Sequence, residues 1–282
     1  MTYFAKITVL ASILALLSAV VCAQRQEISI AAAADLKFAM EELSEQFQKQ
    51  TGTKVNATYG SSGNFFSQMQ NGAPFDLFFS ADIEYPRRLE ATGLAEPGTL
   101  YEYAVGRIVI WTLPDAKMDV TKQGWKGLLD ASVKKIAIAN PEHAPYGRAA
   151  VAALQKAGIY ESVKNKLVYG ENISQAAQFV QSGNAQAGIL ALSLAISPAM
   201  RDGKRWEIPA DMHPALEQGA IILKGAKDKE AARAFLEFVK STVGRAILAK
   251  YGFEFPDKTK EQKINAPTLR RRGSADTEAN QQ

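Results

Sequence analysis

Cysteine is nearly absent from this sequence, and histidine is scarce. The 282 residues include one cysteine, Cys22, and two histidines, His143 and His213. These counts exclude a disulfide scaffold and a cysteine-ligated metal site, and they disfavour a histidine-rich one. The fold must therefore be stabilised by its hydrophobic core, and hydrophobic residues make up 47% of the chain.

The sequence also lacks a concentrated charge of one sign. The net charge is +4, but the densest basic run is only residues 270–272. No basic stripe is interleaved with aromatic residues, so we expect no nucleic-acid partner. Residues 257–282 are polar with few apolar side chains, which predicts a disordered tail.

The one long hydrophobic run lies at the N-terminus. Lys6 precedes an apolar stretch at 7–21, and two small residues follow it. This order predicts a signal peptide, residues 1–23, whose cleavage releases a periplasmic protein. An uncleaved membrane anchor is the alternative, although the stretch is short for a spanning helix. Lipid attachment at Cys22 is a further alternative, and the valine before it disfavours that processing.

Strand-like and helix-like segments alternate through the rest of the chain. Short apolar runs read as strands at 27–33, 55–59, 75–80, 106–112, 135–139, 166–169, 187–192 and 218–223. Segments with helical spacing follow most of them, and 228–250 reads as purely helical. Such alternation predicts an α/β fold with mainly parallel sheets.

The two sets of strand–helix units predict two lobes. We expect crossings between the lobes near 103–105 and 209–217. Lobe 1 would then comprise residues 24–104 and 215–256, and lobe 2 residues 105–214.

Three strand-to-helix junctions share one design. They are residues 31–35 (AAAAD), 60–63 (GSSG) and 140–147 (NPEHAPYG). Each has small or turn-forming residues where the first helical amides lack partners, and such amides bind anions without any lysine or arginine. In open α/β sheets these junctions lie at the carboxyl ends of strands, where ligands bind. We therefore predict an anion site, in which Ser62 also caps its helix.

A serine hydrolase is the alternative from a different functional class. Ser62 would be the nucleophile and His143, next to Glu142, the base. However, residues 60–63 lack the Gly-x-Ser-x-Gly spacing of a strained nucleophile elbow. His143 also falls in a stretch that reads as a surface turn. We therefore expect no enzymatic activity.

Several segments together carry a resemblance to a known family. They are AAAADLKFAMEEL (31–43), YGSSGNFFSQMQNGAPFDLFFSAD (59–82), IANPEHAPYG (138–147), YGENISQAAQFVQSGNAQAGILALSLA (169–195) and KYGF (250–253). They resemble the periplasmic molybdate-binding proteins of ABC importers, the ModA family, across nearly all of residues 27–256. The patterns GAPxDLFxSAD and NPEHxPxG are specific to that family and its close tungstate-binding relatives.

The resemblance implies a fold, a ligand and partners. The fold is the type II periplasmic binding protein fold, in which two α/β lobes joined by hinge strands close on one dehydrated tetrahedral oxyanion. The function is capture of molybdate, or tungstate, and delivery to the permease and ATPase of an ABC importer. The protein would act as a monomer, without a cofactor and with no metal other than that of the bound oxyanion.

Carrying the family's site over by position implies a donor set of neutral groups. The serine of the second junction matches Ser62, with Ser61 as a helper. The others, which use backbone amides, match the alanine of the SAD motif, the residue between proline and glycine, and the residue after Glu-Asn. The expected ligand-binding residues are thus Ala34, Ser61, Ser62, Ala81, Tyr146 and Ile173.

Two positions depart from the family pattern. Many members have serine or threonine at the first junction, whereas this chain has Ala34, followed by Asp35. A carboxylate facing a dianion would be repulsive, so we expect Asp35 to turn aside and cap the helix that follows. Ala191 stands where some members place a tyrosine hydroxyl on the anion. These changes leave open a receptor for sulfate or another tetrahedral oxyanion. A signalling or scaffold protein that keeps the fold is a further alternative.

Overall fold

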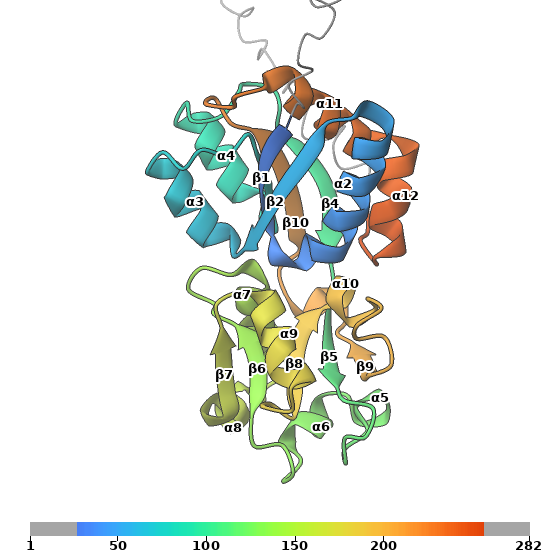
Figure 1. The fold of residues 1–282 in the computed structure, drawn as a ribbon. Coiled ribbons are helices and arrows are strands. Elements are labelled where there is room, and N and C mark those ends of the chain that lie inside the picture. Colours follow the sequence, from blue (N-terminus) through green and yellow to red (C-terminus); the bar gives the residue numbers. More distant parts are fainter. Residues whose placement is uncertain (1–26, 257–282) are drawn as a thin grey trace, which may run out of the picture.

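The computed structural model describes residues 27–256. The predicted signal peptide (1–23) and the predicted tail (257–282) lie outside the described residues. The described chain forms two lobes, stacked one above the other in Figure 1, and each is built on a five-stranded sheet with helices around it. The predicted pair of α/β lobes is therefore confirmed.

Lobe 1, at the top of Figure 1, contains the beginning and the end of the described chain. Its sheet has the order β2-β1-β3-β10-β4. The strands are β1 (Glu27–Ala33), β2 (Lys54–Gly60), β3 (Leu77–Ser80), β4 (Tyr101–Gly106) and β10 (Leu216–Ile222). The helices are the 3-10 turn η1 (Ala34–Leu36), α2 (Lys37–Thr51), α3 (Ser62–Gln70), α4 (Glu84–Ala91), α11 (Lys229–Lys240) and α12 (Thr242–Lys250).

Lobe 2 contains the middle of the chain, and its sheet has the order β7-β6-β8-β5-β9. The strands are β5 (Ile108–Thr112), β6 (Ile136–Ala139), β7 (Leu167–Gly170), β8 (Ala187–Ala191) and β9 (Lys204–Glu207). The helices are α5 (Val120–Gln123), α6 (Trp125–Leu129), α7 (Pro145–Lys156), α8 (Tyr160–Val163), α9 (Ile173–Gln181) and α10 (Leu192–Ala195), with the 3-10 turns η2 (Lys164–Lys166) and η3 (Ala210–Met212).

Both sheets are mixed: in each, four of the five strands point the same way, in agreement with the prediction of mainly parallel sheets, and one strand is reversed. In lobe 1, β1 is parallel to β2 and β3, whereas β10 is antiparallel to β3 and β4. Lobe 2 repeats this arrangement, with β6 parallel to β7 and β8, and β5 antiparallel to β8 and β9. The antiparallel strands are those beside the crossings, where the chain enters a sheet from the other lobe.

Two crossings join the lobes. Strand β4 stays paired with β10 as far as Gly106, and β5 begins at Ile108, so the first crossing is at Arg107, beyond the predicted range of 103–105. The Arg107 guanidinium pairs with Glu207 of lobe 2 at 3.0 Å and also with Glu254 of lobe 1. The second crossing runs from η3 into β10.

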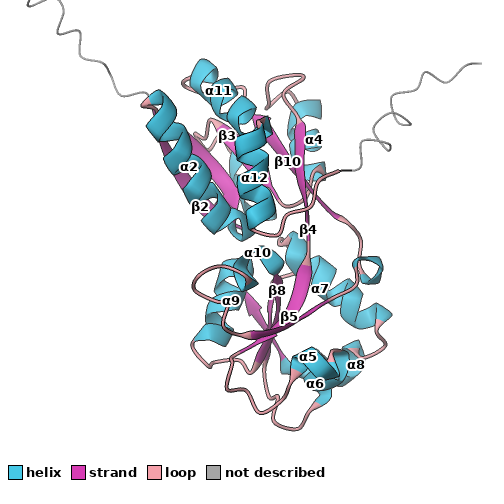
Figure 2. Ribbon diagram, turned by 90° about the vertical axis from the view of Figure 1, so that its right-hand side faces the viewer, coloured by secondary structure: helices cyan, strands magenta, loops and turns pink. Residues whose placement is uncertain are grey.

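Helices cover both faces of the lobe 1 sheet (Figures 1 and 2). Alternation along β3 sends Phe79 into the core beneath α2, α11 and α12, and Phe78 into the core beneath α3 and α4. The segment predicted as purely helical, 228–250, is two helices. Ser241 separates them, and its hydroxyl accepts a hydrogen bond from the Gly244 amide at 3.2 Å as the cap of α12.

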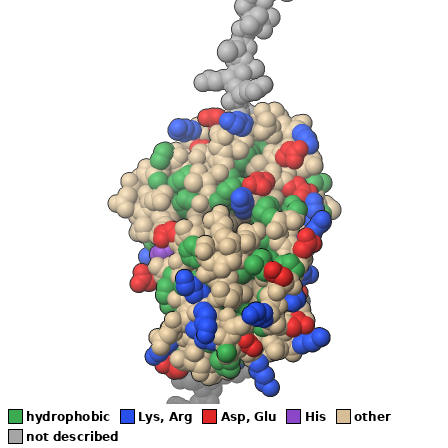
Figure 3. Space-filling model, turned by 60° about the horizontal axis from the view of Figure 1, so that its bottom comes forward, with side chains coloured by type: hydrophobic (Ala, Val, Ile, Leu, Met, Phe, Trp, Pro, Cys, Tyr) green, Lys and Arg blue, Asp and Glu red, His purple; other side chains and the backbone are tan. Residues whose placement is uncertain are grey.

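The surface carries no single-sign face in the view of Figure 3, where lysines and arginines are interspersed with acidic residues. Within residues 27–256, no helix combines the length and the apolar character needed to cross a membrane.

Candidate anion-binding site

Three of the predicted residues lie in the first turns of helices. Ser62 is the first residue of α3, Tyr146 the second of α7, and Ile173 the first of α9. Amides in a helix's first turn have no intrahelical acceptor and carry partial positive charge. The chain specifies these helix starts locally. Pro145 occupies the first position of α7, and the Asn172 side chain caps α9 by accepting from the Gln175 amide at 3.1 Å.

The α3 start contacts lobe 2 directly. The Gly63 amide donates to the His143 carbonyl at 2.9 Å, and Ser61 Oγ lies 2.9 Å from His143 Nδ1. Asn64 donates to the Glu171 carboxylate. The approach requires a glycine, because a Cβ at position 63 would lie 2.6 Å from the His143 carbonyl oxygen. The lobes are thus closed against each other at α3.

Ser62 is fully buried and linked to Ala81. Its Oγ accepts a hydrogen bond from the Ala81 amide at 2.9 Å. Neither Ser62 nor Ser61, the residue before α3, caps this helix with its side chain, so the predicted capping role of Ser62 is wrong. Because Oγ is an acceptor in this contact, its own proton is available for another acceptor. The Ala81 amide, predicted as a donor to the anion, donates to the Ser62 side chain in this structure.

Asp35 is the centre of a buried network between the lobes. Its Oδ2 accepts hydrogen bonds from the Tyr146 hydroxyl at 2.9 Å and from Gln218 Nε2 at 2.8 Å. The Tyr103 hydroxyl donates to Gln218 Oε1 at 2.6 Å. Tyr103 is on β4 and Gln218 on β10, the strands that flank the crossings, whereas Tyr146 belongs to lobe 2. The network therefore joins the anion-site helices to the hinge strands.

The prediction that Asp35 caps a helix is wrong. Neither η1 nor α2 has a side-chain cap, because the carboxylate contacts Tyr146 and Gln218 instead. Desolvation by burial raises the pKa of the Asp35 carboxyl from 3.8 to about 6, and hydrogen bonds from Gln218, from Tyr146 and from the backbone amides of Asp35 and Leu36 only partly oppose it. Its Oδ1 is buried without a hydrogen-bond partner.

Further cross-lobe bonds hold the η1 backbone. The Ser174 hydroxyl donates to the Ala34 carbonyl at 2.9 Å, and the Ser193 hydroxyl donates to the Asp35 carbonyl at 2.8 Å. Ser193 lies two residues beyond Ala191, the position that departs from the family pattern. A hydroxyl therefore does reach the first junction from this part of lobe 2, although it binds the backbone there.

The structure gathers all six predicted residues at the lobe boundary, and all are buried. The side chains that connect them were not predicted as part of the site: Tyr103, His143, Ser174, Ser193 and Gln218. Of these, His143 had been named within the third junction and as the base of the hydrolase alternative. Gln218 carried a sequence signal as a polar residue at the start of an apolar run, and the structure buries it fully.

The geometry does not support the pairing of Ser62 with His143 that the hydrolase alternative requires. The histidine contacts Ser61 instead, and Ser62 Oγ is bonded to the Ala81 amide. The nearest acid, Glu171, lies 3.6 Å from His143 Nε2, beyond a good hydrogen bond, and its carboxylate is held by Asn64. A serine–histidine–acid relay is therefore not assembled among these residues.

Two cavities open along the lobe boundary. One, of about 310 Å³, is lined by residues of both lobes that include Ala81, Asp82, Pro145, Arg148 and Glu217. Arg148 also forms a cross-lobe ion pair with Asp82 at 2.6 Å. The other, of about 130 Å³, is lined by residues that include Phe38, Ser174 and Leu194. Of the predicted residues, Ala81 lines the larger of these two cavities.

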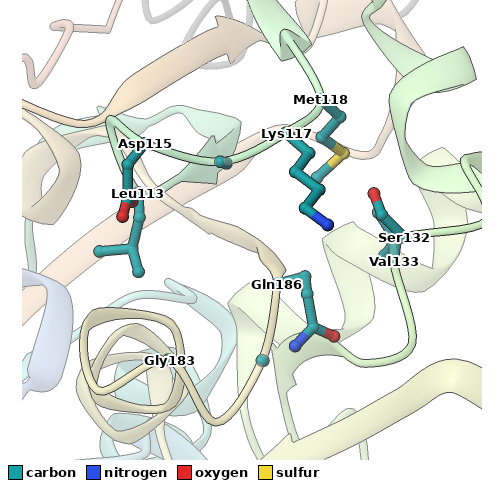
Figure 4. Close-up of a pocket in the computed structure, with 10 residues that line it drawn as sticks. Leu113, Asp115, Lys117, Met118, Ser132, Val133, Gly183 and Gln186 are labelled. Atoms are coloured by element: carbon teal, nitrogen blue, oxygen red, sulfur yellow. The ribbon is translucent and has the colours of Figure 1, made fainter.

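A third cavity, of about 390 Å³, lies within lobe 2, and none of the predicted residues lines it. Figure 4 shows Lys117, Met118, Ser132 and Gln186 around it. Its lining mixes apolar side chains with the polar side chains of Asp115, Lys117, Ser132 and Gln186. In the described part of the chain, no group of three histidine, cysteine or acidic residues is arranged to hold a metal ion.

Comparison with known proteins places the chain in a family. Residues 28–254 match the family of bacterial extracellular solute-binding proteins. The chain is 40% identical to the molybdate-binding protein ModA of Azotobacter vinelandii over 82% of this chain and 91% of that protein. It is 38% identical to the ModA of Rhodobacter capsulatus over 80% and 88% of the two chains.

A solved structure agrees with the sequence relatives. The periplasmic molybdate-binding protein of Azotobacter vinelandii superimposes with a TM-score of 0.77 at 33% identity, covering 82% of this chain and all of that one. The expected type II binding-protein fold is thereby confirmed. The chain is a member of the bacterial extracellular solute-binding protein family and, within it, of the ModA family.

Proposed function

We propose that this protein is a periplasmic receptor that binds molybdate, or tungstate, between its lobes and delivers it to an ABC importer. The observation that carries the proposal is the convergence of helix starts from both lobes on one buried boundary. α3 comes from lobe 1, and α7 and α9 come from lobe 2. These helices offer amides to an anion without placing a lysine or arginine against it.

The proposed donors are neutral and come from both lobes. Lobe 1 contributes the Ala34 amide and the Ser62 hydroxyl, which the Ala81 amide orients from 2.9 Å. Lobe 2 contributes the amides of Tyr146 and Ile173. Hydrogen bonds to a charged group contribute roughly 1.5–3 kcal/mol each. The four together contribute roughly 6–12 kcal/mol, and an affinity of 1 μM corresponds to about 8 kcal/mol.

A neutral donor set also suits release. When the anion leaves, no buried lysine or arginine loses its counter-charge, so opening carries no cost of stranding a cation. Donors divided between the lobes make binding and closure one event, because the ligand stabilises the closed state by its differential affinity. Molybdate and tungstate are larger than sulfate and carry the same charge. The size of the closed cavity therefore discriminates between these two anions and sulfate.

The same proposal covers location and partners. Export by a cleaved signal peptide places the receptor in the periplasm, where a permease and its ATPase take the anion from the closed receptor. The receptor works as a monomer, carries no cofactor and catalyses no reaction. Membership of a solute-binding family supports this assignment.

Replacing Ser62 by alanine tests the proposed site. The change removes one hydroxyl donor to the anion, so molybdate affinity should fall by about 10- to 100-fold, as expected for one hydrogen bond to a charged group. Isothermal titration calorimetry with molybdate measures the effect.

Ser67→Ala provides the matched control, because Ser67 is on the same helix but exposed. Its affinity should equal that of the unmodified protein. Equal affinities for Ser62→Ala and Ser67→Ala would remove Ser62 from the site. Ester hydrolysis by the purified protein, lost in Ser62→Ala, would instead support the hydrolase alternative.

A further inference from the structure

Asp35 is an unusual group to find at the boundary where an anion is proposed to bind. It follows Ala34, whose amide is a proposed ligand donor, and its carboxylate accepts the hydroxyl of Tyr146, whose amide is another. Asp35 is therefore next in the chain to one proposed donor and hydrogen-bonded to the side chain of the residue that provides another. A dianion and an ionised carboxylate that share one buried boundary repel each other, because the effective dielectric constant there is low.

The bonding of the carboxylate distinguishes its two oxygens. Oδ2 accepts from both Tyr146 and Gln218, whereas Oδ1 is buried without a partner. Asp35 as a whole is 1% exposed. An ionised carboxylate is destabilised by leaving one oxygen unsatisfied in this way. A proton on Oδ1 removes the charge, leaves the two bonds to Oδ2 in place and creates a new donor inside the closed site.

We propose that Asp35 takes up a proton when the oxyanion binds, so that the closed complex contains a neutral carboxylic acid. This inference rests on the proposed function, because it needs a dianion between the lobes. Asp35 then determines affinity and its pH dependence. It accommodates the ligand as a neutral donor, whereas the ionised form opposes binding.

The other side chains that face Asp35 keep the same charge across the pH range of the experiment, so Asp35 is the group that takes up the proton. Tyr103 on β4 and Tyr146 on α7 are also fully buried, and burial raises the pKa of each phenol well above its usual range, so both stay neutral. Gln218 on β10 and Ser193 on α10 do not titrate. Among the described residues, no cation forms an ion pair with Asp35, so its charge has no direct compensation there.

The direction of the pH effect follows from linkage. Burial already raises the pKa of the ligand-free Asp35 carboxyl to about 6, so near pH 8 it is mostly ionised. A nearby dianion raises this pKa further, and the complex binds the proton that the free protein lacks. Affinity therefore increases as pH falls, by up to about tenfold per pH unit, until the pH falls below the free protein's pKa.

Calorimetric titration of the purified protein with sodium molybdate at pH 8 tests this directly. Titration in several buffers of different ionisation enthalpy gives the number of protons bound per ligand. We expect close to one proton per molybdate for the unmodified protein and close to none for Asp35→Asn. His143→Gln, which removes the titratable side chain at the same boundary, should still take up close to one proton.

Each outcome bears on one claim. Molybdate binding with no proton uptake by the unmodified protein would overturn the inference and leave the proposed function intact. Uptake that persists in Asp35→Asn would assign the proton to another group and would also overturn it. Absence of molybdate binding would instead contradict the proposed function. If Asp35→Asn fails to fold, molybdate affinity of the unmodified protein between pH 6 and 9 decides, and a pH-independent affinity would overturn the inference.

Discussion

Gly63→Ala is expected to weaken molybdate binding by about 5- to 150-fold while the protein stays folded. The new Cβ would lie 2.6 Å from the carbonyl oxygen and 3.0 Å from the Cα of His143 in the other lobe. It would also disturb the 2.9 Å hydrogen bond from the Gly63 amide to that oxygen. Overpacking against backbone typically costs about 1–3 kcal/mol. Since a ligand bound between the lobes requires closure, the cost appears in its affinity.

The stability of the ligand-free variant separates blocked closure from misfolding. Gly63 is inside α3, where alanine forms helix more readily than glycine by about 1 kcal/mol. Within lobe 1 the new Cβ would lie 2.9 Å from the Tyr85 hydroxyl, which is the far end of a side chain and can shift, so lobe 1 should stay folded. Gly225→Ala is the matched control, because its Cβ would meet no atom within 4 Å. Titration calorimetry and small-angle X-ray scattering would report affinity and closure. Normal affinity in Gly63→Ala would show that the ligand-bound lobes do not meet at His143.

Asp35→Asn is expected to change how stability depends on pH. The native pKa of this carboxyl is about 6, above its ordinary value of 3.8, so the native state binds the proton more tightly than the unfolded state. The stabilisation is fully present below about pH 4 and is lost as pH rises to about 6. The free energy of unfolding falls by about 3 kcal/mol over this range. The asparagine side chain does not titrate, so the variant does not show this fall.

The free energy of unfolding, measured by urea denaturation without ligand at pH 4 and pH 8, checks this expectation. On going from pH 4 to pH 8, the free energy of unfolding of the variant should rise by about 3 kcal/mol relative to that of the unmodified protein. Asp202→Asn, at a side chain that is 90% exposed, should show no such trend. A pH-independent difference for Asp35→Asn would mean that the carboxyl is hydrated in the ligand-free protein, with the lobes open.

Much of the fold was accessible from local sequence patterns. The helix α2 ends at Thr51, where the sequence has a glycine to mark the end: Gly52 adopts a left-handed conformation with φ of 77° as its C-cap. The short buried strands were recognisable from continuous apolar runs. The antiparallel strands β5 and β10 were not recognised as such, because strand direction depends on where the chain re-enters a sheet.

The site was predictable in its backbone and less so in its side chains. Helix starts are signalled by neighbouring residues such as Pro145 and Asn172, so amide donors could be placed from sequence. The hydrogen bonds from Tyr146 and Gln218 to the Asp35 carboxylate join residues 111 and 183 positions apart, and no local pattern encodes them. The expectation that Asp35 would cap a helix followed a local preference that the buried network with Tyr146 and Gln218 overrides.

Titration of the purified protein with molybdate, tungstate and sulfate tests the central claim most directly. The account predicts submicromolar binding of molybdate and tungstate at one site per chain, with sulfate at least about 100-fold weaker because it is too small to reach both sets of donors. Tight sulfate binding would show that the changes at Ala34, Asp35 and Ala191 have altered the ligand. No binding of any of the three would contradict an oxyanion receptor altogether.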